Sequence, residues 1–203
     1  VPWSDPVVGP PASYRVWVAS DSPIQLIGTG SSMDATNQPS TAPLAAYASG
    51  VPTSYVAAAG SPIARDFAVA VVPGVSERPF EIQTAVGTTG SDQTTIRLVA
   101  KDAPPSVGAT VLDVAQEACS VFGQTLATYP YDELELIFLP ISALGVEYPG
   151  FLVLSDSLLA SSGFVAGGPI AIVREATVAH EVAHQWFYSI VGNNQVREPW
   201  LDE

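Results

Sequence analysis

Short stretches in which apolar and β-branched residues alternate with polar ones occupy the first half of the chain. Clusters of Gly, Pro and Ser separate them at a spacing of roughly 8–12 residues, which is typical of all-β domains. The stretches are residues 14–19, 24–28, 54–59, 67–72, 80–85 and 94–100. Residues 1–13 are rich in proline, and residues 29–50 have little periodicity. We expect the first of these to be extended and the second to form a long loop.

In the second half of the chain, apolar residues recur with the period of an α-helix in two segments. Ser106 is a suitable N-cap, and apolar residues recur at helical spacing over residues 107–127. Residues 134–139 and 151–154 have the composition of strands. A second helical pattern at residues 172–191 is apolar nearly all round, and a helix of that kind is usually buried.

A break at residues 101–105, which include two adjacent prolines, separates the two patterns. Strands on one side of the break and mixed helices and strands on the other predict an α+β fold. We expect a β-sandwich-like N-terminal domain at residues 1–101 and a second domain at residues 102–203.

The second helical pattern carries the chain's 2 histidines. His180 and His184 are one helical turn apart, so both imidazoles lie on one face, and Glu181 follows the first of them. In a His-Glu-x-x-His helix the histidines bind zinc and the glutamate acts as general base. Chance spacing in an ordinary helix is the alternative, and it is disfavoured because the chain has no other histidine.

A catalytic zinc site needs a third protein ligand, so that the fourth position can hold water. Gly192-Asn193-Asn194 is a suitable end for the histidine-bearing helix, and Pro199 suits the first position of another. A returning helix would bring Glu203 beside His180 and His184, and we predict Glu203 as the third ligand. The alternative is a carboxylate that the helix dipole favours in a first turn.

The segment from Val178 to Glu203 resembles the aminopeptidase N-like family of gluzincin metallopeptidases. The motifs that carry the resemblance are His180-Glu181-Val182-Ala183-His184-Gln185-Trp186-Phe187, Val191-Gly192-Asn193 and Trp200-Leu201-Asp202-Glu203. Upstream, Gly145-Val146-Glu147-Tyr148-Pro149-Gly150 is similar to the family's Gly-x-Met-Glu-Asn exopeptidase motif. In it, Val146 stands at the methionine and Tyr148 at the asparagine.

This resemblance implies a thermolysin-like zinc-peptidase domain that binds one zinc ion through the two histidines and Glu203. It implies that Glu181 is the general base acting on a zinc-bound water. Gly145, Val146 and Glu147 would contact the substrate, with the Glu147 carboxylate binding the free α-ammonium of a peptide or protein. The enzyme would then release N-terminal residues. The alternative for Glu147 is a solvated loop acid.

The resemblance is strong over residues 129–203, where Tyr129-Pro130-Tyr131 is similar to the segment that precedes the exopeptidase motif, and weak before them. Arg65-Asp66-Phe67 is similar to a segment of the family's N-terminal β domain, but we favour an edge-strand ion pair there. The family's oxyanion-stabilising tyrosine lies beyond the glutamate ligand. We therefore expect a fragment that is inactive alone and that holds zinc weakly or not at all.

Two other functions stay open. An endopeptidase of the thermolysin type would share the zinc ligands and the base but would lack an anchor for the substrate amine. A non-catalytic binding or scaffold domain would keep the fold, although such a domain has no physical need for Glu181.

Composition narrows the choice of partners and compartment. A net charge of -13 excludes nucleic acid, which requires a basic face. Cys119 is the lone cysteine, so no disulfide forms within the chain, and we expect a buried free thiol. No apolar run approaches the roughly 18 residues of a membrane span. Few charged residues and 18 prolines indicate an extracellular or cell-envelope protein.

Overall fold

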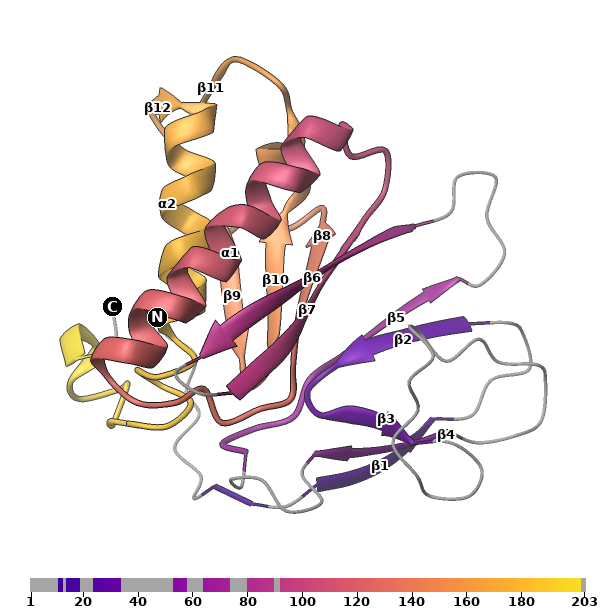
Figure 1. Ribbon diagram of the computed structural model, residues 1–203, viewed down its shortest axis with the longest axis vertical. Helices are drawn as coiled ribbons and strands as arrows, with labels where there is room; N and C mark the ends of the chain where they lie inside the picture. The colour runs from indigo at the N-terminus through magenta and orange to yellow at the C-terminus, as the bar shows by residue number, and fades with distance from the viewer. Residues whose placement is uncertain are drawn as a thin grey trace.

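A five-stranded mixed sheet forms the centre of the protein in its computed structural model (Figure 1). The structure describes residues 11–12, 14–18, 24–33, 53–57, 64–73, 80–89 and 92–201. The central strands lie in the order β6 (Glu81–Thr89), β7 (Asp92–Ala100), β8 (Glu133–Leu139), β10 (Phe151–Ser155) and β9 (Gly145–Tyr148). The inner strands β7, β8 and β10 are parallel, whereas β6 and β9 run antiparallel at the two edges.

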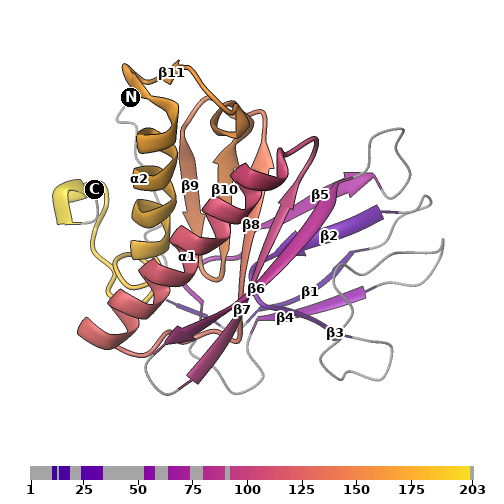
Figure 2. The same cartoon turned by 45° about the horizontal axis from the view of Figure 1, so that its top comes forward.

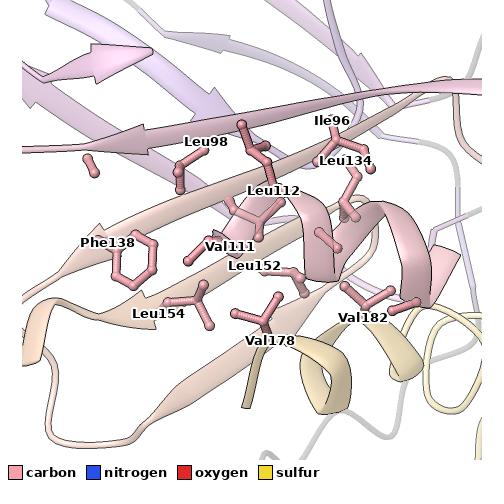
Figure 3. Packing of buried hydrophobic residues seen from close by; sticks show 14 of the residues in the cluster. Ile96, Leu98, Val111, Leu112, Leu134, Phe138, Leu152, Leu154, Val178 and Val182 are labelled. Carbon is pink, nitrogen blue, oxygen red and sulfur yellow. The ribbon is translucent and has the colours of Figure 1, made fainter. Parts of the chain in front are cut away.

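Helices α1 (Pro105–Thr125) and α2 (Ile170–Ala183) cover one face of this sheet (Figures 1 and 2). Successive side chains of a strand point to opposite faces, so alternate residues of the sheet meet the helices. The core between them contains Ile96, Leu98, Leu134, Phe138, Leu152 and Leu154 from the strands, Val111 and Leu112 from α1, and Val178 and Val182 from α2 (Figure 3). Full burial of one such side chain contributes about 1.5–3 kcal/mol, so this packing fixes the histidine-bearing helix firmly.

A layer of short strands covers the other face of the central sheet (Figure 1). Its strands are the antiparallel pair β2 (Ile24–Gly28) and β5 (Val69–Pro73), and the group β1 (Tyr14–Val18), β4 (Thr53–Ala57) and β3 (Ser31–Met33). The buried side chains of Ile27 and Val72 pack against Val99, Ile137 and Phe151 of the sheet. The six stretches predicted as strands in the first 100 residues thus all contain strands, whereas β3 lies in the predicted loop at residues 29–50.

Helix α1 begins one residue before its predicted N-cap. Pro104 is the N-cap and Pro105 the first helical residue, so the prediction of Ser106 as N-cap is wrong. Proline fixes φ near its helical value and needs no hydrogen-bond partner for its nitrogen, which suits a helix start. On the buried side of α1, Cys119 is a free thiol as predicted, and burial raises its pKa to about 12.

Helix α2 ends at Ala183, and His184 is its C-cap, so the prediction of a helix up to residue 191 is wrong. The hydrophobic pattern continues, but the backbone turns: Tyr188 has φ 90°, a left-handed conformation that no α-helix contains. Its N–H bonds to the carbonyl of Val191. Among the described residues after Pro199, only the short 3-10 helix η2 (Pro199–Leu201) forms.

The mixture of helices and sheets confirms the predicted α+β class. The central sheet includes strands on both sides of the predicted boundary at residues 101 and 102, and the division into two domains stays a prediction. Within the described residues, no helix combines the length and apolar character needed to cross a membrane.

Candidate metal centre and substrate site

The two histidines converge at the C-terminal end of α2. The Nε2 atoms of His180 and His184 are 3.0 Å apart, and the ring planes are nearly perpendicular at 87°. Two nitrogens bound at 2.0–2.1 Å to one tetrahedral zinc ion would lie about 3.3 Å apart, so the observed pair fits a shared ion with little movement. His184 is buried and His180 is exposed, which leaves the pair accessible from one side.

Glu181 lies beside this pair and is only 4% exposed. Strand β9 approaches it so closely that a Cβ at Gly145 would overlap the Glu181 carboxylate. Gly145 is therefore required by the position of the carboxylate, and this contact explains why the first residue of the upstream motif has no side chain. The sequence named both residues but did not show that they touch.

Glu147 is buried on β9, so the interpretation of Glu147 as a solvated loop acid is wrong. Donor atoms of Glu147, Glu181 and His184 lie within 4.8 Å of one another. This group shares only His184 with the predicted ligand set of His180, His184 and Glu203. We consider the imidazole pair the better zinc site, because its nitrogens match the spacing that one ion imposes.

Glu203 lies outside the described residues, and its role as third ligand stays a prediction. Val146 is half-buried on β9, opposite Val153 of β10. Tyr148, at the asparagine position of the family motif, stacks on Phe151 with ring centroids 6.0 Å apart. Its aromatic ring thus contributes to packing at the end of β9.

A cavity of about 700 Å³ opens over these groups. Strand β9 forms one wall and α2 another. The turn between β11 (Phe164–Val165) and β12 (Gly168–Pro169) contributes Ala166. The residues that line the cavity are Leu144, Gly145, Glu147, Ala166, Ile172, Val173, Ala176, Thr177, His180 and Glu181. One chamber therefore holds both carboxylates and one imidazole, next to an apolar wall that could accept a side chain.

Gln185 and Trp186, which follow the second histidine, hold this arrangement together. The Gln185 amide donates to the carbonyl of Tyr148 at 3.0 Å and accepts from the N–H of Gly150 at 2.8 Å. The Trp186 indole donates to the carbonyl of Ala127 at 2.6 Å. These bonds tie the end of α2 to the β9–β10 turn and to the segment after α1. The two residues that follow the second histidine therefore stabilise the position of the helix that carries the site.

Arg65 and Asp66 contact the segment after α2, which sequence reasoning missed. Arg65 Nε donates to the carbonyl of Tyr188 at 2.7 Å, and the Tyr188 hydroxyl donates to Asp66 at 2.6 Å. The favoured interpretation of an edge-strand ion pair did not anticipate these long-range bonds. The similarity of Arg65-Asp66-Phe67 to a family segment was the signal that could have suggested them.

Comparison with known proteins gives the family. No protein-family model matches the chain. Aminopeptidase M1-B of Oryza sativa subsp. japonica is 32% identical over 151 residues, which are 70% of this chain and 16% of that protein. Human aminopeptidase O is 29% identical over 96 residues, 46% of this chain and 11% of that protein. The chain belongs to the M1 aminopeptidase family. This confirms the predicted family, and the chain spans about a sixth of the length of the rice M1 relatives.

Solved structures agree with the M1 fold. Legionella pneumophila aminopeptidase A, in complex with aspartic acid, matches 88% of this chain and 20% of its own, with a TM-score of 0.60 and 17% identity. An M1 zinc metallopeptidase from Deinococcus radiodurans matches 94% of this chain and 37% of its own, with a TM-score of 0.53 and 20% identity.

Proposed function

We propose that this chain forms the zinc site and the amine-binding strand of an aminopeptidase that releases N-terminal residues from peptides or proteins. The observation that carries the proposal is the convergence of the His180 and His184 Nε2 atoms at 3.0 Å, beside buried Glu181 and within reach of buried Glu147. The M1 relatives named above are aminopeptidases or zinc metallopeptidases, which supports both the metal and the reaction.

His180, His184 and Glu203 would hold one zinc ion, which supplies Lewis-acid polarisation of the scissile carbonyl when bound. Glu181 would take a proton from the attacking water on a carboxylate oxygen and pass it to the leaving amine. Gly145 leaves room for that carboxylate, and burial in the cavity excludes bulk water around it.

Glu147 would give the enzyme its preference for chain ends. A substrate whose scissile carbonyl lies at the histidines would place its first residue in the cavity, where the carboxylate of Glu147 can pair with an α-ammonium. Charge-assisted hydrogen bonds of this kind are roughly twice as strong as neutral ones. The arrangement of a β-sandwich-like domain before a thermolysin-like domain is part of the same proposal.

We further propose that these 203 residues alone are inactive and hold zinc weakly, because the chain covers only 16% of the rice relative. An extracellular or cell-envelope location is proposed from composition only. An endopeptidase or a non-catalytic domain is a less favoured function, because Glu147 is buried with Glu181 beside one cavity.

The test compares amino-acid anilides with a free or an N-acetylated amine, using the natural full-length protein and its Glu147→Ala variant. We expect turnover of the free substrate only. Glu147→Ala should lower kcat/KM for it by roughly 10–100-fold, the value of a lost charge-assisted bond, with zinc content unchanged. Equal turnover of both substrates by the unaltered protein would support an endopeptidase, and indifference to chelators would end the metallopeptidase proposal.

A further inference from the structure

The segment that leaves α2 makes a strained reversal at Tyr188. Its φ of 90° is unusual for a residue with a side chain, and the surrounding structure must hold it there. Tyr188 is nevertheless buried, with 2% exposure. It lies four positions beyond His184 and before η2, in the stretch of sequence that joins the histidines to the predicted third ligand, Glu203.

Two neighbouring residues just before β5 hold Tyr188 from both sides. The Arg65 guanidinium binds its backbone carbonyl at 2.7 Å, and Asp66 accepts its hydroxyl at 2.6 Å. The Arg65 group also lies against Gly192, where a Cβ would overlap it. A charged donor on the carbonyl and a charged acceptor on the hydroxyl fix the backbone and the ring of one residue together.

The layer of short strands anchors these two residues in turn. The Tyr14 hydroxyl of β1 donates to the carbonyl of Arg65 at 3.4 Å, and the Tyr14 and Phe67 rings are 5.8 Å apart. Tyr131 lies near the same groups. Burial, together with the Asp66 charge, raises its pKa to about 12, so it stays a neutral phenol. Strand β1 and the segment at Tyr131 therefore lie close to the pair of residues, Arg65 and Asp66, that holds Tyr188.

Farther along, the segment is held by local bonds. The Asn194 side chain accepts from the N–H groups of Val196 and Arg197, and the Asn193 side chain donates to the carbonyl of Glu198 at 2.6 Å. Such bonds shape the end of the segment. Its start is joined to the end of α2 by backbone bonds from the Ser189 N–H to the carbonyl of His184 at 3.1 Å and from the Val191 N–H to the carbonyl of Trp186 at 2.8 Å. The contact of Tyr188 with Arg65 and Asp66 adds the long-range bonds that hold the segment against a distant part of the chain.

We propose that Arg65 and Asp66 are positioning residues for the metal centre, and that they act by holding the segment between His184 and the third ligand. The inference rests on the proposed zinc site. Without the clamp formed by Arg65, Asp66 and Tyr188, the segment would sample more conformations, and zinc binding would have to offset that entropy. The strand layer would thus contribute to the affinity of a metal that it does not touch.

The test measures zinc affinity of the natural full-length apoprotein by competition with a chromophoric chelator. We expect Asp66→Ala and Tyr188→Phe to weaken zinc binding by about tenfold, a coupling common for residues that share one network. Asp66→Asn keeps an acceptor for the hydroxyl and should lose less than about threefold. Tyr129→Phe is the matched control, because it removes a buried hydroxyl that donates to the carbonyl of Glu133 at 3.1 Å. It should lower the melting temperature of the apoprotein without changing zinc affinity.

A Glu203→Gln background shows whether the clamp acts through the third ligand. With that ligand lost, Asp66→Ala should have less than about a twofold further effect. The clamp would be overturned if Asp66→Ala lowered zinc affinity equally in the unaltered protein and in the Glu203→Gln background. It would also be overturned if Tyr129→Phe lowered zinc affinity as much as Asp66→Ala does. Zinc affinity that depends on His184 but not on Asp66 would overturn only the clamp. Affinity unchanged by His184→Ala would overturn the proposed function itself.

Discussion

Two pairs of carboxylates lie on opposite faces of the central sheet, and they differ in the groups that surround them. Glu133 and Glu135 of β8 point towards the strand layer and share the guanidinium of Arg97 on β7. Glu147 and Glu181 point into the 700 Å³ cavity on the helix face, beside two imidazoles. One group is paired with a single arginine of the sheet, and the other lines a cavity that can admit a cation.

Whether a carboxylate pairs with an arginine or faces a cavity distinguishes a structural ion cluster from a functional site better than its burial does. Glu135 is only 7% exposed, comparable to Glu147 at 8%. Desolvation raises the pKa of Glu135 to about 7 despite the nearby Arg97. A raised carboxyl pKa therefore does not by itself indicate catalysis here. The Glu135 carboxylate pairs with Arg97 and does not line the cavity.

The largest effect is expected at Glu181. Glu181→Gln keeps the shape of the side chain but removes the base, so kcat should fall by about 10²–10⁴-fold while zinc remains bound. Glu175→Gln changes an exposed acid of the same helix and is the matched control, with activity expected to be unchanged. If both variants keep full activity, the base is a different residue.

The next effect is expected at Gly145. Gly145→Ala would push the Glu181 carboxylate from its position, and a displacement of about 1 Å near reacting atoms can cost about 10²-fold in rate. Because the three atoms nearest to an added Cβ all belong to Glu181, the zinc content should stay constant. Single-turnover kinetics and metal analysis check the two halves of this prediction, and an undiminished rate would show that the close approach does not position the base.

The smallest effect, on stability alone, is expected at Glu135. Its pKa rises from 4.5 to about 7 on folding, so between these pH values the folded chain holds a proton that the unfolded chain releases. The free energy of unfolding should therefore fall by about 1–3 kcal/mol as pH rises from about 4.5 to about 7. Urea unfolding at several pH values measures this slope.

Glu135→Gln should remove that slope, and Glu133→Gln, which alters the more exposed partner of Arg97, should retain it. Neither variant should alter activity. A change in substrate turnover in Glu135→Gln would show that the two carboxylate groups are coupled and that the contrast between them is false.

The sequence predicted those features of the fold and the site that depend only on residues close together in the chain. The i, i+4 spacing of His180 and His184 requires only that one helix forms, and alternation in β7 requires only that one face is buried. The family motif singled out Glu147 but did not show that this residue is buried. Its neighbours could not be predicted, because they depend on how β9 packs against α2.

The end of the histidine-bearing helix and the contacts between distant segments could not be predicted either, because both depend on packing between parts far apart in the chain. Nothing in the apolar run after His184 marks the left-handed turn at Tyr188, which Arg65 and Asp66 stabilise from 123 and 122 residues away. Likewise, the edge-strand interpretation of Arg65 and Asp66 considered only their sequence neighbours. Contacts between distant segments follow from the assembled fold.

Anomalous scattering at the zinc edge, from crystals of the natural full-length protein, would show whether one zinc ion lies between the two histidines. We predict one peak bound by Nε2 of His180, Nε2 of His184 and a carboxylate oxygen of Glu203, with Glu181 and Glu147 outside the ligand set. A peak held instead between Glu147 and Glu181, or histidines that point apart with no peak between them, would contradict it.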